Sequence, residues 1–225
     1  MREVYIMHIM RTRSHGNSSL KSAASAALAG LGRSIAGGLQ HMAGRPRRRE
    51  SADRRLLETA ILPAYASDPG VGRILFCGCA PYTQHYEAIF RGRDYWTLDP
   101  VPRHRRHGAA RHVVAGLQDL AQHFPAATFD LVVCNGVLGW GLDTAGDAEA
   151  AFAACTTGLR AGGHLLLGWN DVWPHNRVTP ERISALRRFE PIPLGPHAAR
   201  VRVAAPHRHV FDFYRKRTAG TATSG

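Results

Sequence analysis

The chain has 225 residues, 44% of them hydrophobic, and a formal net charge of +12 at pH 7. This length suits one α/β domain with additional segments at its ends, and the hydrophobic content is ordinary for a globular protein. No apolar run is long enough to span a membrane, which excludes a protein built around a membrane-spanning helix.

The positive charge is concentrated in the first 50 residues, where no acidic residue lies between Glu3 and Glu50. Four leucines, one alanine and one isoleucine recur at steps of three and four from Leu20 to Leu39, which predicts an amphipathic helix within this basic arm. We expect a lid or accessory helix; a transit peptide or an interfacial helix is the alternative. A solvated arm is the simpler interpretation of the charge, and attraction to nucleic acid, a membrane surface or an acidic acceptor is the other.

The rest of the chain alternates between strand and helix patterns, and we expect one domain over 51–217 followed by a flexible tail, 218–225. A helix is expected at 51–66. The expected strands are 73–77, 94–98, 111–115, 129–134, 163–168, 199–204 and 208–215, and the expected helices between them are 83–91, 117–123, 146–160 and 179–188. This order predicts an α/β, Rossmann-like, doubly wound and mostly parallel seven-stranded sheet, with an antiparallel last strand and N-terminal helices.

The segment Arg73-Ile-Leu-Phe-Cys-Gly-Cys-Ala-Pro-Tyr82 carries the most information. Its apolar run stops at Gly78, so a cofactor can approach bare main chain at the carboxyl end of a parallel strand. Asp99 ends the next predicted strand, 21 residues after Gly78. Its carboxylate can accept hydrogen bonds from a ribose diol, or it can cap a turn before Pro100.

These elements resemble the class I S-adenosylmethionine-dependent methyltransferases. In that family a Gly-rich loop follows the first strand, an acid ends the second, the fourth has a Phe-Asp-Leu-Val pattern as in 129–132, and a Gly-Gly turn as in 162–163 precedes the fifth. The chain departs from the family loop at Phe76, which replaces an acid, and at Ala80 and Tyr82, which replace glycines.

The resemblance implies S-adenosyl-L-methionine as cofactor and a set of contacts at the carboxyl ends of the strands. It implies methionine contacts from Gly78, Cys79, Ala80 and Tyr82, a ribose contact from Asp99, adenine contacts from Leu117 and Gln118, and a position under the sulfonium for Asn135 and Gly136. Tyr82 itself, Gln84 or His85 could bind the methionine moiety in place of the family residues that this loop does not have. For Asn135 and Gly136 an ordinary turn is the alternative.

Two clusters of aromatic and polar residues follow the predicted strands 129–134 and 163–168. From them we expect an acceptor pocket lined by Trp140, Trp169, Asn170 and Trp173, with Asp143, Asp171 and His175 as candidate general bases. The alternative is that the tryptophans close the ends of the core and that His175 is a surface residue.

The expected reaction is methyl transfer to an O or N nucleophile of a small molecule or saccharide, because an activated sulfonium needs mainly alignment with its nucleophile. We expect no metal, since the cysteines lack zinc-ligand spacing; the alternative is a metal held by Asp143, Asp171 and Asn170, whose geometry the sequence does not fix. Disulfides are not expected, which suits a reducing cytoplasm. The alternatives are a non-catalytic Rossmann-like protein that binds a ligand or nucleic acid, and a nicotinamide-dependent oxidoreductase. The loop lacks the Gly-x-Gly-x-x-Gly pattern of the last class.

Overall fold

The computed structural model describes residues 51–172, 176–204 and 207–218, all within the unit formed by residues 46–225. The expectations for the basic arm, 1–50, and for most of the tail, 219–225, lie outside these residues. Among the residues described, no helix has the length and apolar character needed to cross a membrane.

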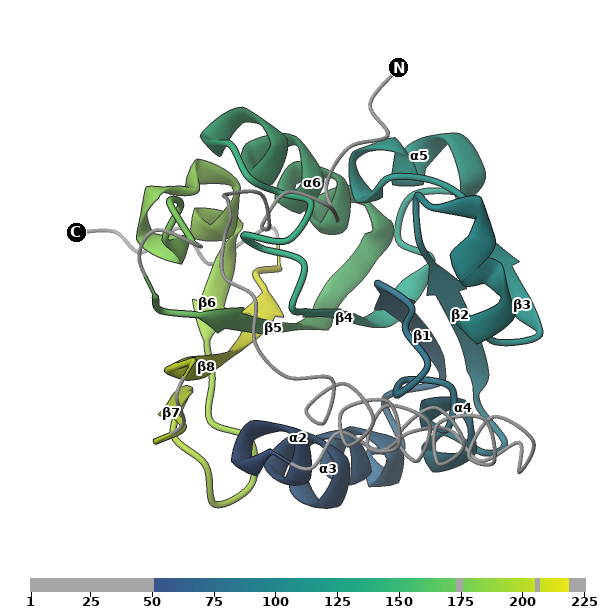
Figure 1. The fold of residues 1–225 in the computed structure, drawn as a ribbon, viewed down its shortest axis with the longest axis horizontal. Coiled ribbons are helices and arrows are strands. Elements are labelled where there is room, and N and C mark those ends of the chain that lie inside the picture. Colours follow the sequence, from purple (N-terminus) through teal and green to yellow (C-terminus); the bar gives the residue numbers. More distant parts are fainter. Residues whose placement is uncertain (1–50, 173–175, 205–206, 219–225) are drawn as a thin grey trace, which may run out of the picture. The chain divides into compact units, whose positions relative to one another are not determined.

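One sheet organises the described residues (Figure 1). Its strands are β1 (Arg73–Cys77), β2 (Asp94–Leu98), β3 (Arg111–Val113), β4 (Phe129–Asn135), β5 (Leu159–Asn170), β6 (Phe189–Pro191), β7 (Arg200–Arg202) and β8 (His209–Lys216). The order is β3-β2-β1-β4-β5-β8-β6, with β7 also paired to β8. The first five strands in this order are parallel, and β8 is antiparallel to β5. The predicted Rossmann-like sheet is therefore confirmed, and the short strand β6 adds to it.

Helices cover both faces of the sheet (Figure 1). On one face lie α2 (Ala52–Leu56), a π-helical turn (Leu57–Ile61), α3 (Leu62–Ser67) and α4 (Tyr86–Ile89); on the other lie α5 (Leu120–His123) and α6 (Ala145–Gly158). Each face has its own apolar cluster because side chains alternate along the strands: Phe76 packs with Tyr86 on the first face, and Phe152 packs with Cys77 on the second.

The π-helical turn interrupts the helix predicted over 51–66. Pro63 lies at the beginning of α3, directly after this turn. Proline has no N–H, and its ring clashes with the carbonyl four residues earlier, so a wider turn before it removes that clash. The helical register therefore changes at Pro63, where the sequence predicted only that the helix ends nearby.

The helix predicted over 179–188 is wrong. The structure has two short 3₁₀ segments there, Pro180–Arg182 and Ser184–Arg188. Between them Ile183 is extended, with φ −98° and ψ 107°, and only 2% of its surface is exposed. Burial of this side chain in the core interrupts the helix. The predicted helix 83–91 is likewise shorter, since α4 covers only Tyr86–Ile89.

The strand register brings the predicted site residues to one edge of the sheet. Cys77 pairs with Leu98 on one side and with Cys134 on the other, Asn135 pairs with Gly168, and Asn170 pairs with His209. The residues that follow β1, β2 and β4 therefore lie at the same edge as the end of β5 and the beginning of β8. Ligands of open parallel sheets bind at this edge.

Candidate functional site

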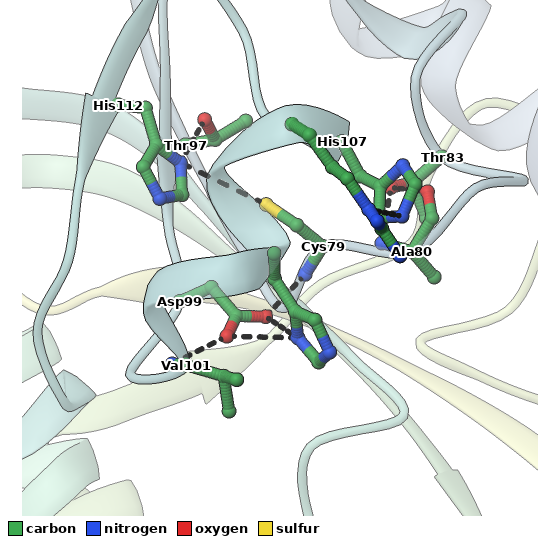
Figure 2. Close-up of polar contacts among 10 residues, drawn as sticks. Cys79, Ala80, Thr83, Thr97, Asp99, Val101, His107 and His112 are labelled. Atoms are coloured by element: carbon green, nitrogen blue, oxygen red, sulfur yellow. Dashed lines mark hydrogen bonds and ion pairs between the residues drawn. The ribbon is translucent and has the colours of Figure 1, made fainter.

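Asp99 directly follows β2 and is buried, with 4% of its surface exposed. Its Oδ2 accepts a hydrogen bond from the main-chain N–H of Cys79 at 2.7 Å, and its Oδ1 accepts one from Val101 at 2.8 Å (Figure 2). The Nδ1 of His104 lies 3.1 and 3.2 Å from the two carboxylate oxygens. Asp99 therefore caps the turn before Pro100 and also joins the end of β2 to the loop after β1.

The loop after β1 turns at Gly78, whose φ is +88°. A Cβ at this position would meet no atom of the described residues within 4 Å, so these residues leave space beside its main chain. The N–H groups of Gly78 and Ala80 donate to the Leu98 carbonyl (2.8 Å) and the Thr83 hydroxyl (3.0 Å). With the Cys79 N–H bound to Asp99, the protein itself uses all three N–H groups. The loop therefore offers a ligand bare main chain and carbonyl oxygens.

Gly136 forms a second open turn beside the first. Its φ is +73°, a Cβ there would also meet nothing within 4 Å, and its N–H donates to the Gly168 carbonyl at 2.8 Å. Since Cys77 pairs with Cys134, the residues after β1 and β4 are neighbours. Gly78 and Gly136 therefore lie in neighbouring loops, and at each of them the described residues leave space beside the main chain.

Cys79 has a thiol that stays protonated. Burial raises its pKa to about 12, and the negative charge of Asp99 acts in the same direction. Its Sγ lies 4.0 Å from Nδ1 of His112, but burial lowers the pKa of that histidine, so a neutral ring faces the thiol. The sulfur is consequently a poor nucleophile, and Cys79 serves the site through its main chain.

Tyr82, at a position where the family has glycine, packs against a buried arginine of α2. The guanidinium carbon of Arg54 lies 4.6 Å from the Tyr82 ring centroid, and its Nη1 donates a hydrogen bond to the Tyr86 hydroxyl. Arg54 has 8% of its surface exposed, and its Nε has no hydrogen-bond partner among the described residues. Phe76 stands where the family has an acid. Its ring packs edge-on against the Tyr86 ring, with the two ring centroids 5.2 Å apart.

Gln84 and His85, which we considered as cofactor-binding residues, have protein partners instead. Gln84 donates to the Arg106 carbonyl at 2.8 Å, and Nε2 of His85 lies 3.4 Å from the Glu58 carboxylate. That carboxylate also accepts a hydrogen bond from the Tyr86 hydroxyl at 3.1 Å. The interactions with Glu58 hold α4 against the N-terminal helices.

A polar cluster occupies the same sheet edge beyond Gly136. Nδ1 of His209 lies 2.6 Å from Oδ1 of Asn170, and its Nε2 lies 3.1 Å from Oδ1 of Asn135. Burial lowers the pKa of His209 to about 4, a nearby positive charge on Arg54 acts in the same direction, and Asp53 opposes both. His209 is therefore neutral near pH 7.

Leu117 and Gln118, expected beside adenine, lie in the 3₁₀ turn after β3. Leu117 is buried in the core, whereas Gln118 is exposed and its amide donates to Asp119 at 3.1 Å. The Gln118 side chain also folds over Gly116, where a Cβ would collide with it. Of the two residues expected beside adenine, only Gln118 therefore lies at the surface.

The residues expected at the acceptor are not gathered in one place. Trp169 is in the core, where its indole N–H donates to Asp212 at 2.8 Å, because its side chain points to the face opposite Asn170. Trp140 is 63% exposed, and Asp143 is exposed on the same loop. Asp171 forms ion pairs with Arg208 (3.0 Å) and Arg202 (3.5 Å). Trp173 and His175 lie outside the described residues.

Arg54, His104 and His209 were not among the site residues predicted from the sequence. Only His209 had a usable signal: an antiparallel last strand beside 163–168 brings its first residues to the edge where Asn170 lies.

Within the described ranges, no group of three or more His, Cys, Asp or Glu residues is arranged to hold a metal ion. Two surface hollows, of 480 and 420 Å³, lie elsewhere, beside Ser51–Thr59 and Gln84–Tyr95.

Replacement of His209 by glutamine should reduce the loss of stability in acid. Between pH 6.5 and about 4 the unfolded chain binds a proton at His209 that the folded chain does not, so stability falls as pH falls. From pH 8 to pH 5 the free energy of unfolding of the wild type should fall by about 2 kcal/mol more than that of His209→Gln. Urea unfolding at both pH values measures this difference; equal losses would show that His209 is not held neutral.

Comparison with known proteins gives one family match. A family model described as a methyltransferase domain matches residues 75–167. No curated protein matches the chain.

Several solved structures have the same fold. The N-methyltransferase NodS from Bradyrhizobium japonicum WM9 aligns with a TM-score of 0.58 at 20% identity, covering 73% of this chain and 96% of that chain. Its complex with S-adenosyl-L-homocysteine aligns with a TM-score of 0.57 at 20% identity, covering 75% of this chain and 90% of that chain. The PH0226 protein from Pyrococcus horikoshii OT3 aligns with a TM-score of 0.54 at 13% identity, covering 75% of this chain and 93% of that chain.

The matched residues run from β1 through β5, the strands whose carboxyl ends carry Gly78, Asp99 and Asn135. The methyltransferase-domain match over 75–167 and the strand order support the resemblance of this chain to the class I S-adenosylmethionine-dependent methyltransferases.

Proposed function

We propose that residues 51–217 form a domain that transfers a methyl group to an O or N nucleophile of a small molecule or saccharide. The cofactor is S-adenosyl-L-methionine, as the methyltransferase match and the similar structure with bound S-adenosyl-L-homocysteine indicate. When bound, it supplies a methyl group already activated on a sulfonium. The four cysteines are free thiols, which fits our proposal of a cytoplasmic protein.

The observation that carries the proposal is the uncovered main chain of Gly78 and Gly136 beside the buried carboxylate of Asp99. Both glycines have positive φ and open space where a side chain would stand. A ligand can thus approach the backbone closely, and Asp99 can accept hydrogen bonds from a diol beside it. The residues present therefore fit an adenosyl group.

Arg54 is a buried cation beside the altered loop. A buried cation usually has an anionic partner, but none of the ion pairs among the described residues includes Arg54. Its guanidinium lies against Tyr82 of the loop. We assign it to the carboxylate of the methionine moiety, and the loop carbonyls to the methionine ammonium.

One observation favours a non-catalytic relative. His104 lies within hydrogen-bond distance of both Asp99 oxygens, where a ribose diol would bind.

A second candidate is a nucleic-acid-binding protein that uses the basic 3₁₀ segment Pro102–His107. Binding measurements separate these functions from methyl transfer.

The variant Arg54→Met should weaken the binding of S-adenosyl-L-homocysteine by about 10- to 100-fold, because a hydrogen bond to a charged group contributes about 1.5–3 kcal/mol. Isothermal titration calorimetry of the full chain measures the dissociation constant. The matched control is Arg55→Met, at the next position, where the side chain is exposed and the affinity should not change.

The same titration with NAD and with a random oligonucleotide tests the alternatives. We expect the wild type to bind S-adenosyl-L-homocysteine and not NAD. Tight binding of NAD alone would contradict the proposal. Binding of the oligonucleotide alone would favour the nucleic-acid function.

The variant His104→Ala should strengthen the binding of S-adenosyl-L-homocysteine by about fivefold. A ribose must displace the imidazole from Asp99, and removal of a competing hydrogen bond recovers about 1 kcal/mol. The control is His107→Ala in the same 3₁₀ segment, where the side chain contacts Gln84 and not Asp99. Weaker binding by His104→Ala would show instead that His104 takes part in holding the ribose.

A further inference from the structure

Three side chains meet at the sheet edge beyond the proposed cofactor site. Asn135 ends β4, Asn170 ends β5 and His209 begins β8, three strands that lie side by side (Figure 1). The ring of His209 contacts Asn170 at 2.6 Å and Asn135 at 3.1 Å. With 5% of its surface exposed, His209 is buried, so its hydrogen bonds are not shared freely with water.

A glycine in the middle strand makes this contact possible. Asn135 pairs with Gly168, while His209 pairs with Asn170, two residues further along β5. His209 and Asn135 therefore meet across Gly168. A Cβ at Gly168 would collide with Oδ1 of Asn135 and would lie 3.0 Å from Nε2 of His209. The cluster thus depends on the absence of a side chain at this one position.

Burial keeps the His209 ring neutral. Burial is the main reason that its pKa is lowered to about 4; Arg54 of α2 and His207 before β8 lower it further, and Asp53 of α2 raises it. A neutral imidazole has one N–H donor and one acceptor nitrogen. It cannot donate to both asparagine carbonyl oxygens, so one of the two amides must present its NH₂ group to the ring.

The two distances indicate which amide does so. We assign the shorter contact, 2.6 Å, to an N–H···O hydrogen bond and the longer one, 3.1 Å, to an N–H···N hydrogen bond, since nitrogen is the larger acceptor. Nδ1 of His209 then donates to Asn170, and Nε2 accepts from the Asn135 amide. The two ends of an amide have nearly the same shape, so Asn135 can adopt this orientation within the same packing.

We propose that His209, held by Asn170, is a positioning residue that turns the Asn135 carbonyl oxygen toward the open main chain of Gly136, where it accepts a hydrogen bond from the methyl acceptor. The inference rests on the proposed function and narrows its substrate class to nucleophiles that carry an N–H or O–H. The acceptor lone pair forms the bond to the methyl carbon, and the electrons of the broken carbon–sulfur bond stay on sulfur. The proton leaves the acceptor for water, because an amide oxygen is too weak a base to keep it.

Nitrogen NMR of the ¹⁵N-labelled full chain tests this orientation without an acceptor. We expect the His209 ring to be protonated at Nδ1 alone between pH 5.5 and pH 8. We also expect a ¹⁵N–¹⁵N coupling through the hydrogen bond between Asn135 Nδ2 and His209 Nε2. Protonation at Nε2, a mixture of the two tautomers, or a doubly protonated ring would overturn the proposal.

The variant Gly168→Ala places a methyl group between the two side chains. The coupling should disappear, and the Asn135 amide signals should shift. The control Gly146→Ala, in α6, adds a methyl group that lies 3.9 Å from the Thr144 hydroxyl oxygen and should change neither the coupling nor the Asn135 signals. A coupling that persists in Gly168→Ala would overturn the proposal.

If Gly168→Ala does not fold, Asn170→Ala provides the second test. Loss of the Asn170 carbonyl should release Nδ1 and produce a mixture of His209 tautomers; an unchanged tautomer would overturn the role of Asn170. Failure of the wild type to bind S-adenosyl-L-homocysteine would refute the proposed function. Binding of that ligand with the wrong tautomer would refute only the present inference.

Discussion

The carboxylate of Asp99 is the interaction on which the site depends, because it joins two strand ends through the main chain. One oxygen binds the N–H of Cys79 and the other binds the N–H of Val101 (Figure 2). The loop after β1 is thereby fixed against the end of β2, next to the Gly136 turn that follows β4. A buried carboxylate without these donors would be costly, so loop geometry and acid are stabilised together.

The loop after β1, which departs from the family pattern, packs against Arg54 of α2. Phe76 removes a charge that would otherwise be buried in the core, and its ring packs against Tyr86. Tyr82 fills space that a glycine would leave empty, and Arg54 covers its ring. Arg54 of α2 therefore places a positive charge beside the loop, where Phe76 contributes none.

The sequence predicted the sheet well because each buried strand is a short apolar run that ends at a glycine or an acid. It could not predict the side-chain partners across strands. Trp169 and Asn170 are adjacent in sequence, yet they point to opposite faces, and only Asn170 reaches the site edge. The role of Gly168 follows from the register of three strands, which no local pattern contains. The segment 179–188 has helical composition, but burial of Ile183 overrides that preference.

Burial also keeps two side chains of the site, Cys79 and His209, uncharged. The Cys79 thiol is kept protonated by burial and by Asp99, and the His209 ring is kept unprotonated by burial and by Arg54. Neither group can act as the anionic nucleophile or as a strong acid near pH 7. A cationic sulfonium beside them would meet no imidazolium to repel it and no thiolate to take its methyl group. Such a site accelerates transfer by holding an external nucleophile in line, and this requires fixed hydrogen-bond acceptors more than a catalytic base.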